Sequence, residues 1–456
     1  MRSSPMSGRL HVYPGRECLL RMPRRGLLKG QRTWVPNPLD GVVRFAYFWF
    51  DCSTSSGPLP MVLNDMTTTP CPRWLGAGSS DSPVSAEAGR EACLQAVAGR
   101  DRASLLVVFA SDAHDMPALV GAIRGAAPEV PLIGCSTAGE IASAGVGDSS
   151  VVVMALGGDG FRVATSTADV TELGLRGAGG RVASVAAEVA ESPYRVLLVL
   201  SDGLSGDQEE IVRGAYAVVG AQVPLVGGCA GDDLQMIRTT QMFDGSIQTG
   251  TVVAAAIGSD APFGIGVEHG WRRVGDAMVV TESDGVSVLS LDDEPALDVY
   301  LRRLDAPPEA YVDPAAFTRF ALTHPLGLSR RSTEEVRMVA EADFEKRSLT
   351  CIAQVPQGGL AWIMEGDADS VLAATDAACV AALQGLNGAA PLGLFAFDCI
   401  ARRGVLGDEG IRAEFERIAV HADSAPVGGF YTYGEIARNS AIGGFHNQTL
   451  VVLAVG

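Results

Sequence analysis

The chain of 456 residues is poor in charged side chains, and basic residues are in deficit. Its 35 Lys and Arg stand against 53 Asp and Glu, which leaves a formal charge of −18. Such a balance repels phosphate backbones and anionic lipid surfaces. The sequence therefore predicts neither a nucleic-acid partner nor a membrane partner.

Long apolar runs and paired cysteines are missing as well. No run approaches the roughly 18–20 apolar residues that a transmembrane helix needs, and the run at 42–50, VVRFAYFWF, carries Arg44. The nine cysteines stand singly, without a C-x-x-C pair or a regular spacing. They predict buried thiols in a reducing compartment rather than a disulfide or zinc framework. We therefore expect a cytoplasmic protein.

The familiar catalytic signatures are also absent. The chain has no G-x-S-x-G, no H-E-x-x-H and no G-x-x-x-x-G-K-[ST] motif. Cys135 and Cys229 have no histidine beside them in sequence. We expect a protein that is not an enzyme, with no catalytic residues and no metal site. A hydrolase that uses a cysteine or a carboxylate stays open as an alternative.

Residues 1–73 differ in composition from the rest of the chain. They are richer in basic than in acidic residues, contain Pro, Ser and Thr clusters and show little periodicity. Such a segment is typical of a tail that does not fold. We expect a disordered or non-native N-terminal extension, with a natural start at Met66 and residues 1–65 outside the native protein.

A strand, a helix, a second strand and a glycine-rich turn then occur twice in the same order. Buried-strand runs, helix-like patterns that begin after Asp115 or Asp207, and second strands follow one another in both copies. The segments are 104–110, 115–128 and 130–134 in the first copy, and 195–201, 206–221 and 223–228 in the second. Strand-like sequence follows each copy, so a mixed sheet is expected. The pattern predicts an α/β fold with an internally duplicated β/α N-terminal domain at 74–304.

The remainder of the chain reads differently. The segment DAPPEAYVDP at 305–314 is the best candidate for a linker. Beyond it, strand-like runs alternate with an alanine-rich helix and an amphipathic helix, and the chain ends on the apolar strand TLVVLAVG at 449–456. We expect an α+β C-terminal domain at 305–456.

The two turns carry the first candidate site. GCSTAGE (134–140) and GGCAGDD (227–233) each follow the carboxyl end of a strand, where α/β sheets place ligands. Glycines let a ligand approach the backbone, while hydroxyls and carboxylates can hold an amine or a hydroxyl. The alternative is that the glycines serve tight turns and the acids cap helices. The candidate ligand contacts here are Ser136, Thr137, Gly139, Glu140, Gly228, Cys229, Asp232 and Asp233.

Two later segments add candidates. HGW at 269–271 contributes His269 and Trp271, which are equally compatible with a surface loop anchored by its Trp. GGFYTYGEIA (428–437) gathers aromatic residues and a carboxylate that could line a small-molecule pocket or simply fix a loop. Its candidates are Tyr431, Tyr433 and Glu435, followed in the chain by His446.

Together these segments resemble the FIST family, the sensory domains named for F-box and intracellular signal transduction proteins. The matching stretches are VPLIGCSTAGEI (130–141), VPLVGGCAGDD (223–233), FDG (243–245), HGW (269–271), VVTESDGVSVLSLDDEPALDVY (279–300), FDCIARRGVLG (397–407), PVGGFYTYGEI (426–436) and HNQTLVVL (446–453). They extend over the chain from about 85 to 456, and residues 1–73 have no counterpart. Cys229 stands where the family often has Ser.

The resemblance implies a FIST N-terminal plus FIST C-terminal architecture and a bacterial sensory protein that binds a small molecule, such as an amino acid. It implies no resident cofactor. An alternative is a haem-binding nitric oxide sensor that regulates a histidine kinase or a cyclic-di-GMP enzyme, with His269, His446, His114 or a cysteine as axial ligand. The chain carries no fused kinase or cyclase, so its output would require a separate partner protein.

Overall fold

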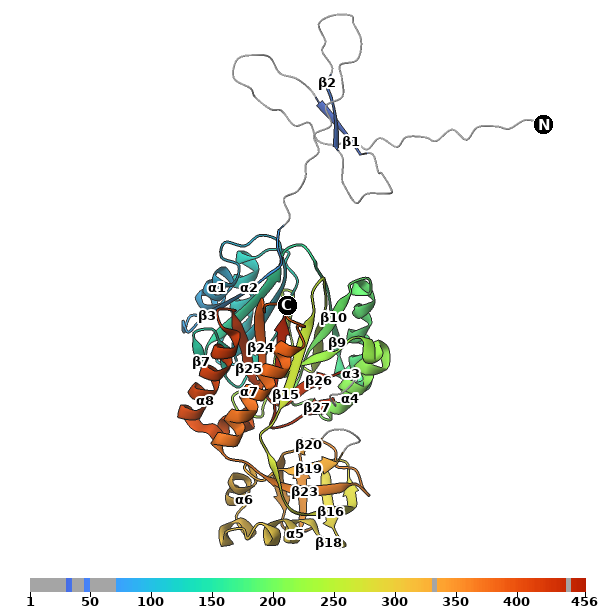
Figure 1. Ribbon diagram of the computed structural model, residues 1–456, viewed down its shortest axis with the longest axis vertical. Helices are drawn as coiled ribbons and strands as arrows, with labels where there is room; N and C mark the ends of the chain where they lie inside the picture. The colour runs from blue at the N-terminus through green and yellow to red at the C-terminus, as the bar shows by residue number, and fades with distance from the viewer. Residues whose placement is uncertain (1–29, 35–44, 50–70, 330–333, 440–443) are drawn as a thin grey trace, which may run out of the picture. The chain divides into compact units, whose positions relative to one another are not determined.

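The structure is a computed structural model that describes residues 30–34, 45–49, 71–329, 334–439 and 444–456. Most of the extension expected at 1–73 lies outside these residues. Within it, β1 (Gly30–Trp34) pairs with β2 (Phe45–Trp49) in antiparallel orientation. A separate compact unit runs from Cys71 to Gly456, and it is shown with its helices and strands in Figure 1. None of the helices in the described residues is long and apolar enough to cross a membrane.

Three six-stranded sheets in the larger unit share one strand order. In each, a central strand pairs in parallel with the strand that follows its helix, and in antiparallel with a later strand that also pairs with an outer strand. In the order central, parallel, antiparallel and outer, the strands are β4 (Ala103–Ser111), β5 (Leu132–Thr137), β8 (Val151–Gly157) and β3 (Trp74–Ser80); β10 (Tyr194–Ser201), β11 (Leu225–Cys229), β14 (Thr251–Ser259) and β9 (Phe161–Asp169); and β24 (Gly393–Cys399), β25 (Val427–Thr432), β28 (Leu450–Val455) and β15 (Phe263–Glu268). We call these three sets of strands, with their helices, the first, second and third repeats.

Two helices accompany each repeat. One precedes the central strand and one connects it to its parallel neighbour, as a parallel pair requires. They are α1 (Ser85–Ala96) and α2 (Met116–Ala126), α3 (Val170–Ala183) and α4 (Gln208–Val219), and α7 (Ala368–Gln384) and α8 (Ile400–Ala422). The expected caps are confirmed, since Asp115 accepts a hydrogen bond from the Ala118 amide and Asp207 one from the Glu209 amide.

The repeats are joined by an exchange of short hairpins. The hairpin of the first repeat pairs with β25 of the third, that of the second with β5 of the first, and that of the third with β11 of the second. The hairpins are β6 (Glu140–Ala142) with β7 (Gly145–Gly147), β12 (Gln241–Phe243) with β13 (Ser246–Gln248), and β26 (Glu435–Arg438) with β27 (Phe445–His446). The exchange closes a ring of three.

The two copies expected from the sequence are therefore present, and a third copy completes them. Pro131, Pro224 and Pro426 precede the three parallel strands, and the carbonyl of each accepts a hydrogen bond from the central strand, at 2.8–2.9 Å. The third copy is hard to see in the sequence because a long insertion separates its outer strand β15 from the rest.

That insertion forms a lobe of its own. It is built from an eight-stranded sheet and short helices around the buried Tyr300 and Phe317. The expected linker at 305–314 lies inside this lobe. Its elements are β16 (Arg272–Asp284), β17 (Ser287–Leu291), β18 (Glu294–Pro295), α5 (Ala296–Arg303), η3 (Pro308–Tyr311), α6 (Pro314–Ala321), β19 (Leu326–Ser329), β20 (Glu334–Arg337), β21 (Val339–Asp343), β22 (Ser348–Cys351) and β23 (Leu360–Glu365).

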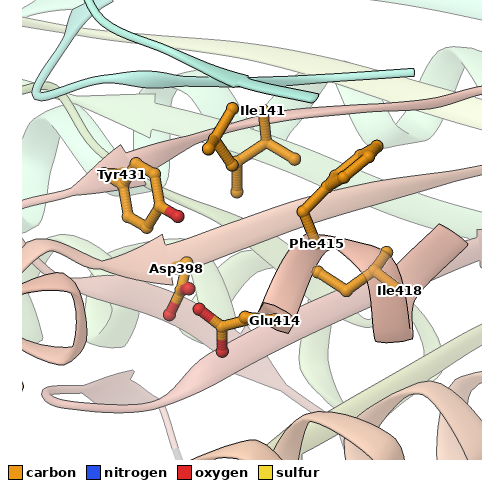
Figure 2. Close-up of a pocket in the computed structure, with 7 residues that line it drawn as sticks. Ile141, Asp398, Glu414, Phe415, Ile418 and Tyr431 are labelled. Carbon is orange, nitrogen blue, oxygen red and sulfur yellow. The ribbon is translucent and has the colours of Figure 1, made fainter. Parts of the chain in front are cut away.

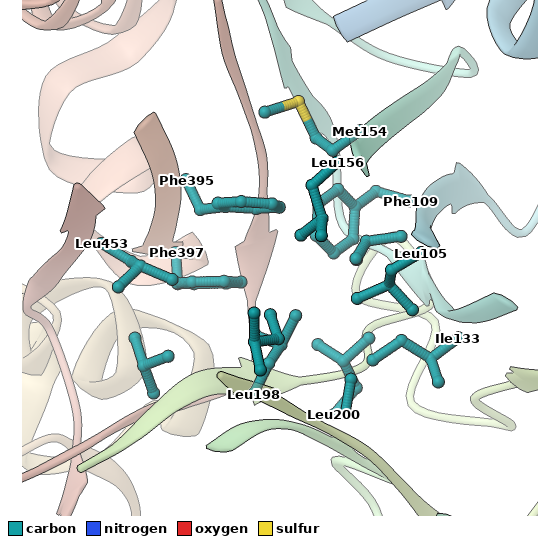
Figure 3. Packing of buried hydrophobic residues seen from close by; sticks show 14 of the residues in the cluster. Leu105, Phe109, Ile133, Met154, Leu156, Leu198, Leu200, Phe395, Phe397 and Leu453 are labelled. Carbon is teal, nitrogen blue, oxygen red and sulfur yellow. The ribbon is translucent and has the colours of Figure 1, made fainter. Parts of the chain in front are cut away.

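One apolar core is shared by the three sheets, each of which turns one face toward it (Figure 3). Phe109 of β4 stacks on Phe430 of β25 with ring centroids 4.8 Å apart, and Phe397 of β24 meets both rings edge-on. Burying a side chain of this size contributes about 1.5–3 kcal/mol. The other face of each sheet packs on its two helices, so strands buried on both faces read as continuous apolar runs.

Candidate functional site

The three turns after β5, β11 and β25 meet one another. The amide of Gly231 donates to the carbonyl of Ser136 (3.0 Å), whose hydroxyl donates to the carbonyl of Gly231 (2.7 Å). The amide of Ala138 donates to the carbonyl of Tyr431 (3.1 Å). A Cβ on Gly231 would lie 3.0 Å from the Cβ of Ala138 and 3.1 Å from the ring of Tyr433. The structure therefore brings the two sequence-predicted turns together with a third.

Glu140 and Glu435 occupy equivalent places at the start of the exchanged hairpins. Glu140 accepts hydrogen bonds from Thr137 and from both the amide and the hydroxyl of Ser150. Glu435 accepts the same three from Thr432 and Thr449. Both side chains are fully buried. Protein donors thus occupy both oxygens of each carboxylate, and these residues fasten the hairpins.

Burial raises the pKa of both carboxyls, and the hydrogen bonds lower it only in part. Glu140 and Glu435 each rise from 4.5 to about 7. The second repeat has Gln241 in the same place, where its Oε1 accepts from the amide and hydroxyl of Thr251 and its Nε2 donates to Thr239. One of the three hairpins is therefore fastened without a titratable group.

Asp232 organises the loop that follows β11. Its carboxylate accepts the amides of Met236, Ile237 and Arg238 and the hydroxyl of Tyr433. The Tyr433 hydroxyl in turn accepts the amide of Leu234 (2.7 Å). These contacts fix the loop against the third turn and leave the Asp232 carboxylate well satisfied.

The remaining residues of these turns serve close packing. Asp233 accepts the hydroxyl of Ser111 at 3.2 Å, and burial raises its pKa. Gly139 has a φ of +116°, where a side chain would also meet the guanidinium of Arg403. A Cβ on Gly228 would lie 2.6 Å from Thr432. Close approach of protein to protein therefore accounts for both glycines.

The predicted histidines and Trp271 lie in packed surroundings. The indole of Trp271 donates to the carbonyl of Gln448 (3.0 Å), and its amide donates to Nδ1 of His269 (2.9 Å). Nε2 of His446 donates to the carbonyl of Ala437 (3.0 Å). Burial lowers the pKa of both histidines, that of His269 to about 4.

A haem would need an axial imidazole or thiolate that faces an apolar pocket. His114 has one ring nitrogen 3.3 Å from Ser85 and the other 3.2 Å from the carbonyl of Ser149. His269 and His446 are engaged as described above. These three imidazoles do not fit axial ligation in this arrangement, and we derive no step through haem.

The structure adds a recess that the sequence reading missed. It lies between the hairpin β6–β7, the strands β24 and β25, and the second half of α8, and it holds about 140 Å³ of free space. Figure 2 shows the carboxylates of Asp398 and Glu414 with the hydroxyl of Tyr431 nearby, and Ile141 opposite them. The lining is completed by Val146, Phe415 and Ile418. Tyr431 is the one predicted contact that lines this recess.

Asp398 and Glu414 form the polar floor of the recess with Arg402. Nε of Arg402 donates to Oδ1 of Asp398 (2.7 Å), and its Nη2 donates to Oε1 of Glu414. Thr375 donates to the same Glu414 oxygen (2.7 Å). The second oxygens, Oδ2 of Asp398 and Oε2 of Glu414, are buried and have no hydrogen-bond partner. All three charged side chains are at most 2% exposed.

The charges of this cluster do not balance. One guanidinium faces two carboxyls, so full ionisation would bury a net negative charge, which is costly. Burial, followed by the charge of Glu414, raises the pKa of Asp398 well above its usual value, against the opposing effect of Arg402. The recess is therefore short of one positive charge and has two free acceptors to receive it.

The same place is neutral in the other two repeats. Asp398 pairs with Tyr431 and Leu450, as Ala110 pairs with Ser136 and Val151. Ser201 is the equivalent in the second repeat, and its hydroxyl donates to Gln208 at 2.8 Å. The sequence signal was an Asp at the end of an apolar strand, followed four residues later by Arg402 in FDCIARR.

No group of three or more His, Cys, Asp or Glu side chains that could hold a metal ion occurs among the residues that the structure describes. An uncharacterized protein of Methanocaldococcus jannaschii is 26% identical over 153 residues, which make up 32% of this chain and 30% of that protein. The chain thus matches less than a third of that relative's length. The FIST N domain matches residues 104–294 and the FIST C domain residues 296–438, which is more than half of the chain. The chain therefore belongs to the FIST family of signal-transduction sensory domains.

Proposed function

We propose that this protein is a cytoplasmic, non-catalytic sensor of bacterial signal transduction that binds a small molecule in the recess over Asp398 and Glu414. The observation that carries the proposal is the pair of buried carboxylate oxygens without a partner. A mostly apolar recess with a few convergent polar groups is the usual make-up of a small-molecule site. Buried polar groups that the fold leaves unsatisfied mark functional sites more often than structural ones.

The cysteines support binding rather than nucleophilic catalysis. Burial raises the pKa of the Cys229 thiol to about 12 and that of Cys135 well above its usual value. Since the thiolate is the nucleophile, a thiol in this state is inert at neutral pH. Both side chains are fully buried.

The placement of the recess suggests how occupancy could be communicated. Its walls come from the first repeat through Ile141, from the third sheet through Tyr431, and from α8 through Phe415. Helix α8 is interrupted at Gly407, whose φ of 63° and ψ of −177° are not helical. A ligand would therefore contact two repeats and the part of α8 that lies beyond a break. We propose that a separate protein, such as a histidine kinase or a cyclic-di-GMP enzyme, reads the position of this helix.

A thermal-shift screen of amino acids, amines and other metabolites tests the function. A ligand that binds only the folded state raises the melting temperature in proportion to RT ln(1 + [L]/Kd). We expect at least one compound to stabilise the wild type and Ser201→Ala, the matched change in the second repeat, but not Asp398→Asn. A screen in which no compound stabilises the wild type, with native mass spectrometry showing no retained ligand, would contradict the proposal.

A further inference from the structure

The unpaired oxygens in the recess define the chemistry of what it can hold. Oδ2 of Asp398 and Oε2 of Glu414 are acceptors, both buried, in a cluster that lacks one positive charge. A primary ammonium brings one positive charge and three N–H donors. We infer that the recess binds the ammonium group of a primary amine that carries no carboxylate, between Asp398, Glu414 and the Tyr431 hydroxyl. This inference rests on the proposed function and names its ligand class.

The rest of the lining sets the other half of the ligand. Ile141, Val146, Phe415 and Ile418 are apolar and supply the walls. An alkyl or arylalkyl group would bury its surface against them. A carboxylate on the ligand would meet no free cation there, because Arg402 already serves the two protein carboxyls. A bare metal ion would find too few oxygen ligands, since Ca²⁺ takes six to eight.

The amine enters by displacement of the second half of α8. As the side chains stand, the recess is too narrow for a water molecule. Glu414, Phe415 and Ile418 all lie beyond the break at Gly407, whereas Asp398, Tyr431 and Ile141 belong to the sheet. A Cβ on Gly407 would meet no atom within 4 Å, so the break has room to bend. Ligand binding and helix position are thus the same event.

Binding also releases a proton. Without a ligand, the cluster avoids a buried negative charge by protonating Asp398. The groups that face Asp398 are Arg402 and Glu414 of α8, Tyr431 of β25 and Glu435 of β26. An ammonium ion takes the place of that proton, so its affinity rises by about tenfold per pH unit while Asp398 stays protonated in the free protein.

The test uses the full chain with methylammonium, butylammonium and benzylammonium chloride as probes. Sodium chloride and tetramethylammonium chloride serve as controls, because they carry the charge without N–H donors. We expect the primary amines alone to raise the melting temperature, with the longer two above methylammonium. Isothermal calorimetry in buffers of different ionisation enthalpy should show about one proton released per amine bound, as the linkage argument requires.

Two variants locate the site. Glu414→Gln should weaken amine binding by about tenfold or more, since hydrogen bonds to charged groups are the strong ones. Ile418→Ala keeps the charges and should weaken butylammonium more than methylammonium, which provides a readout if the first variant does not fold. Amines that bind both variants as tightly as the wild type would overturn the inference, as would equal stabilisation by tetramethylammonium.

The inference and the proposed function can fail separately. If a ligand without an ammonium group stabilises the wild type and not Asp398→Asn, the sensor function stands and the amine inference falls. If neither the amines nor any compound of the metabolite screen binds, both fall.

Discussion

The third repeat buries charges where the first two bury neutral groups. Ala110 in the first repeat needs no polar partner, and Ser201 in the second is satisfied by Gln208. Asp398 in the third shares one guanidinium with Glu414, and each carboxylate keeps one oxygen unpaired. The same strand order forms around all three. The scaffold therefore closes without buried charge, and the charges of the third repeat serve something other than folding.

The largest contrast should come from Arg402→Met. It leaves two carboxyls buried without their cation, and the loss of one partner of a buried ion pair costs about 3–5 kcal/mol. Ser201→Ala in the second repeat removes one neutral hydrogen bond, worth about 1 kcal/mol. Urea denaturation of both variants at pH 7.5 checks the difference. Equal losses would show that the third repeat is no more dependent on charge than the second.

The hairpin fastenings offer a second contrast, between glutamate and glutamine. The pKa values of Glu140 and Glu435 rise on folding from 4.5 to about 7. Their stabilising contribution is complete below about pH 4.5 and is lost as the pH rises through about 7, on the order of 3 kcal/mol for each group. Glu140→Gln and Glu435→Gln should each flatten this decline.

Gln241 provides the matched control for that experiment. Gln241→Glu should introduce a decline of stability with pH where the second repeat now has none. Unfolding free energies from pH 4.5 to 8 compare the three variants with the wild type. Curves that run parallel to the wild type would contradict the raised pKa values of the buried glutamates.

Asp398→Asn should make the third repeat resemble the second. The pKa of Asp398 is raised on folding, so its contribution to stability is present below about pH 4 and lost as the pH rises. The amide removes that loss and can donate to Glu414, which should stabilise the ligand-free protein at pH 8 by about 1–2 kcal/mol. Equilibrium unfolding at pH 4 and pH 8 measures it. A uniform destabilisation at both pH values would mean that the acid is needed for the fold.

The smallest effect is expected at the loop that only the second turn carries. Tyr433→Phe removes the hydroxyl that links Asp232 to the amide of Leu234, at a cost of about 1 kcal/mol. Hydrogen exchange should accelerate at residues 234–238 and stay unchanged in the first turn at 136–140. Unchanged exchange in the loop would show that Asp232 holds it alone.

Much of the fold was within reach of the sequence. The strand runs and the caps Asp115 and Asp207 follow from local chemistry, and the two copies follow from their shared VPL-x-G pattern. The third copy also left a signal, because Pro426 precedes Glu435 by the same spacing as Pro131 precedes Glu140. The hairpin exchange was out of reach, since a strand's partner in another repeat is fixed by tertiary contacts.

The site was less accessible for a physical reason. Sequence reading ranks residues by type and spacing, and it selected Thr137, Glu140 and Glu435, whose hydrogen bonds are completed within the fold. What distinguishes Asp398 and Glu414 is an unpaired oxygen, which depends on how Arg402 divides its donors between them. That property exists only in three dimensions.

A crystal structure of the full chain grown with butylammonium would test the central claim most directly. The account predicts a nitrogen within about 3 Å of both Oδ2 of Asp398 and Oε2 of Glu414, with the butyl chain against Ile141 and Phe415. It also predicts that the part of α8 beyond Gly407 moves while Arg402 keeps its contacts. A recess that stays closed at saturating amine, with Asp398 hydrogen-bonded to Glu414, would contradict it.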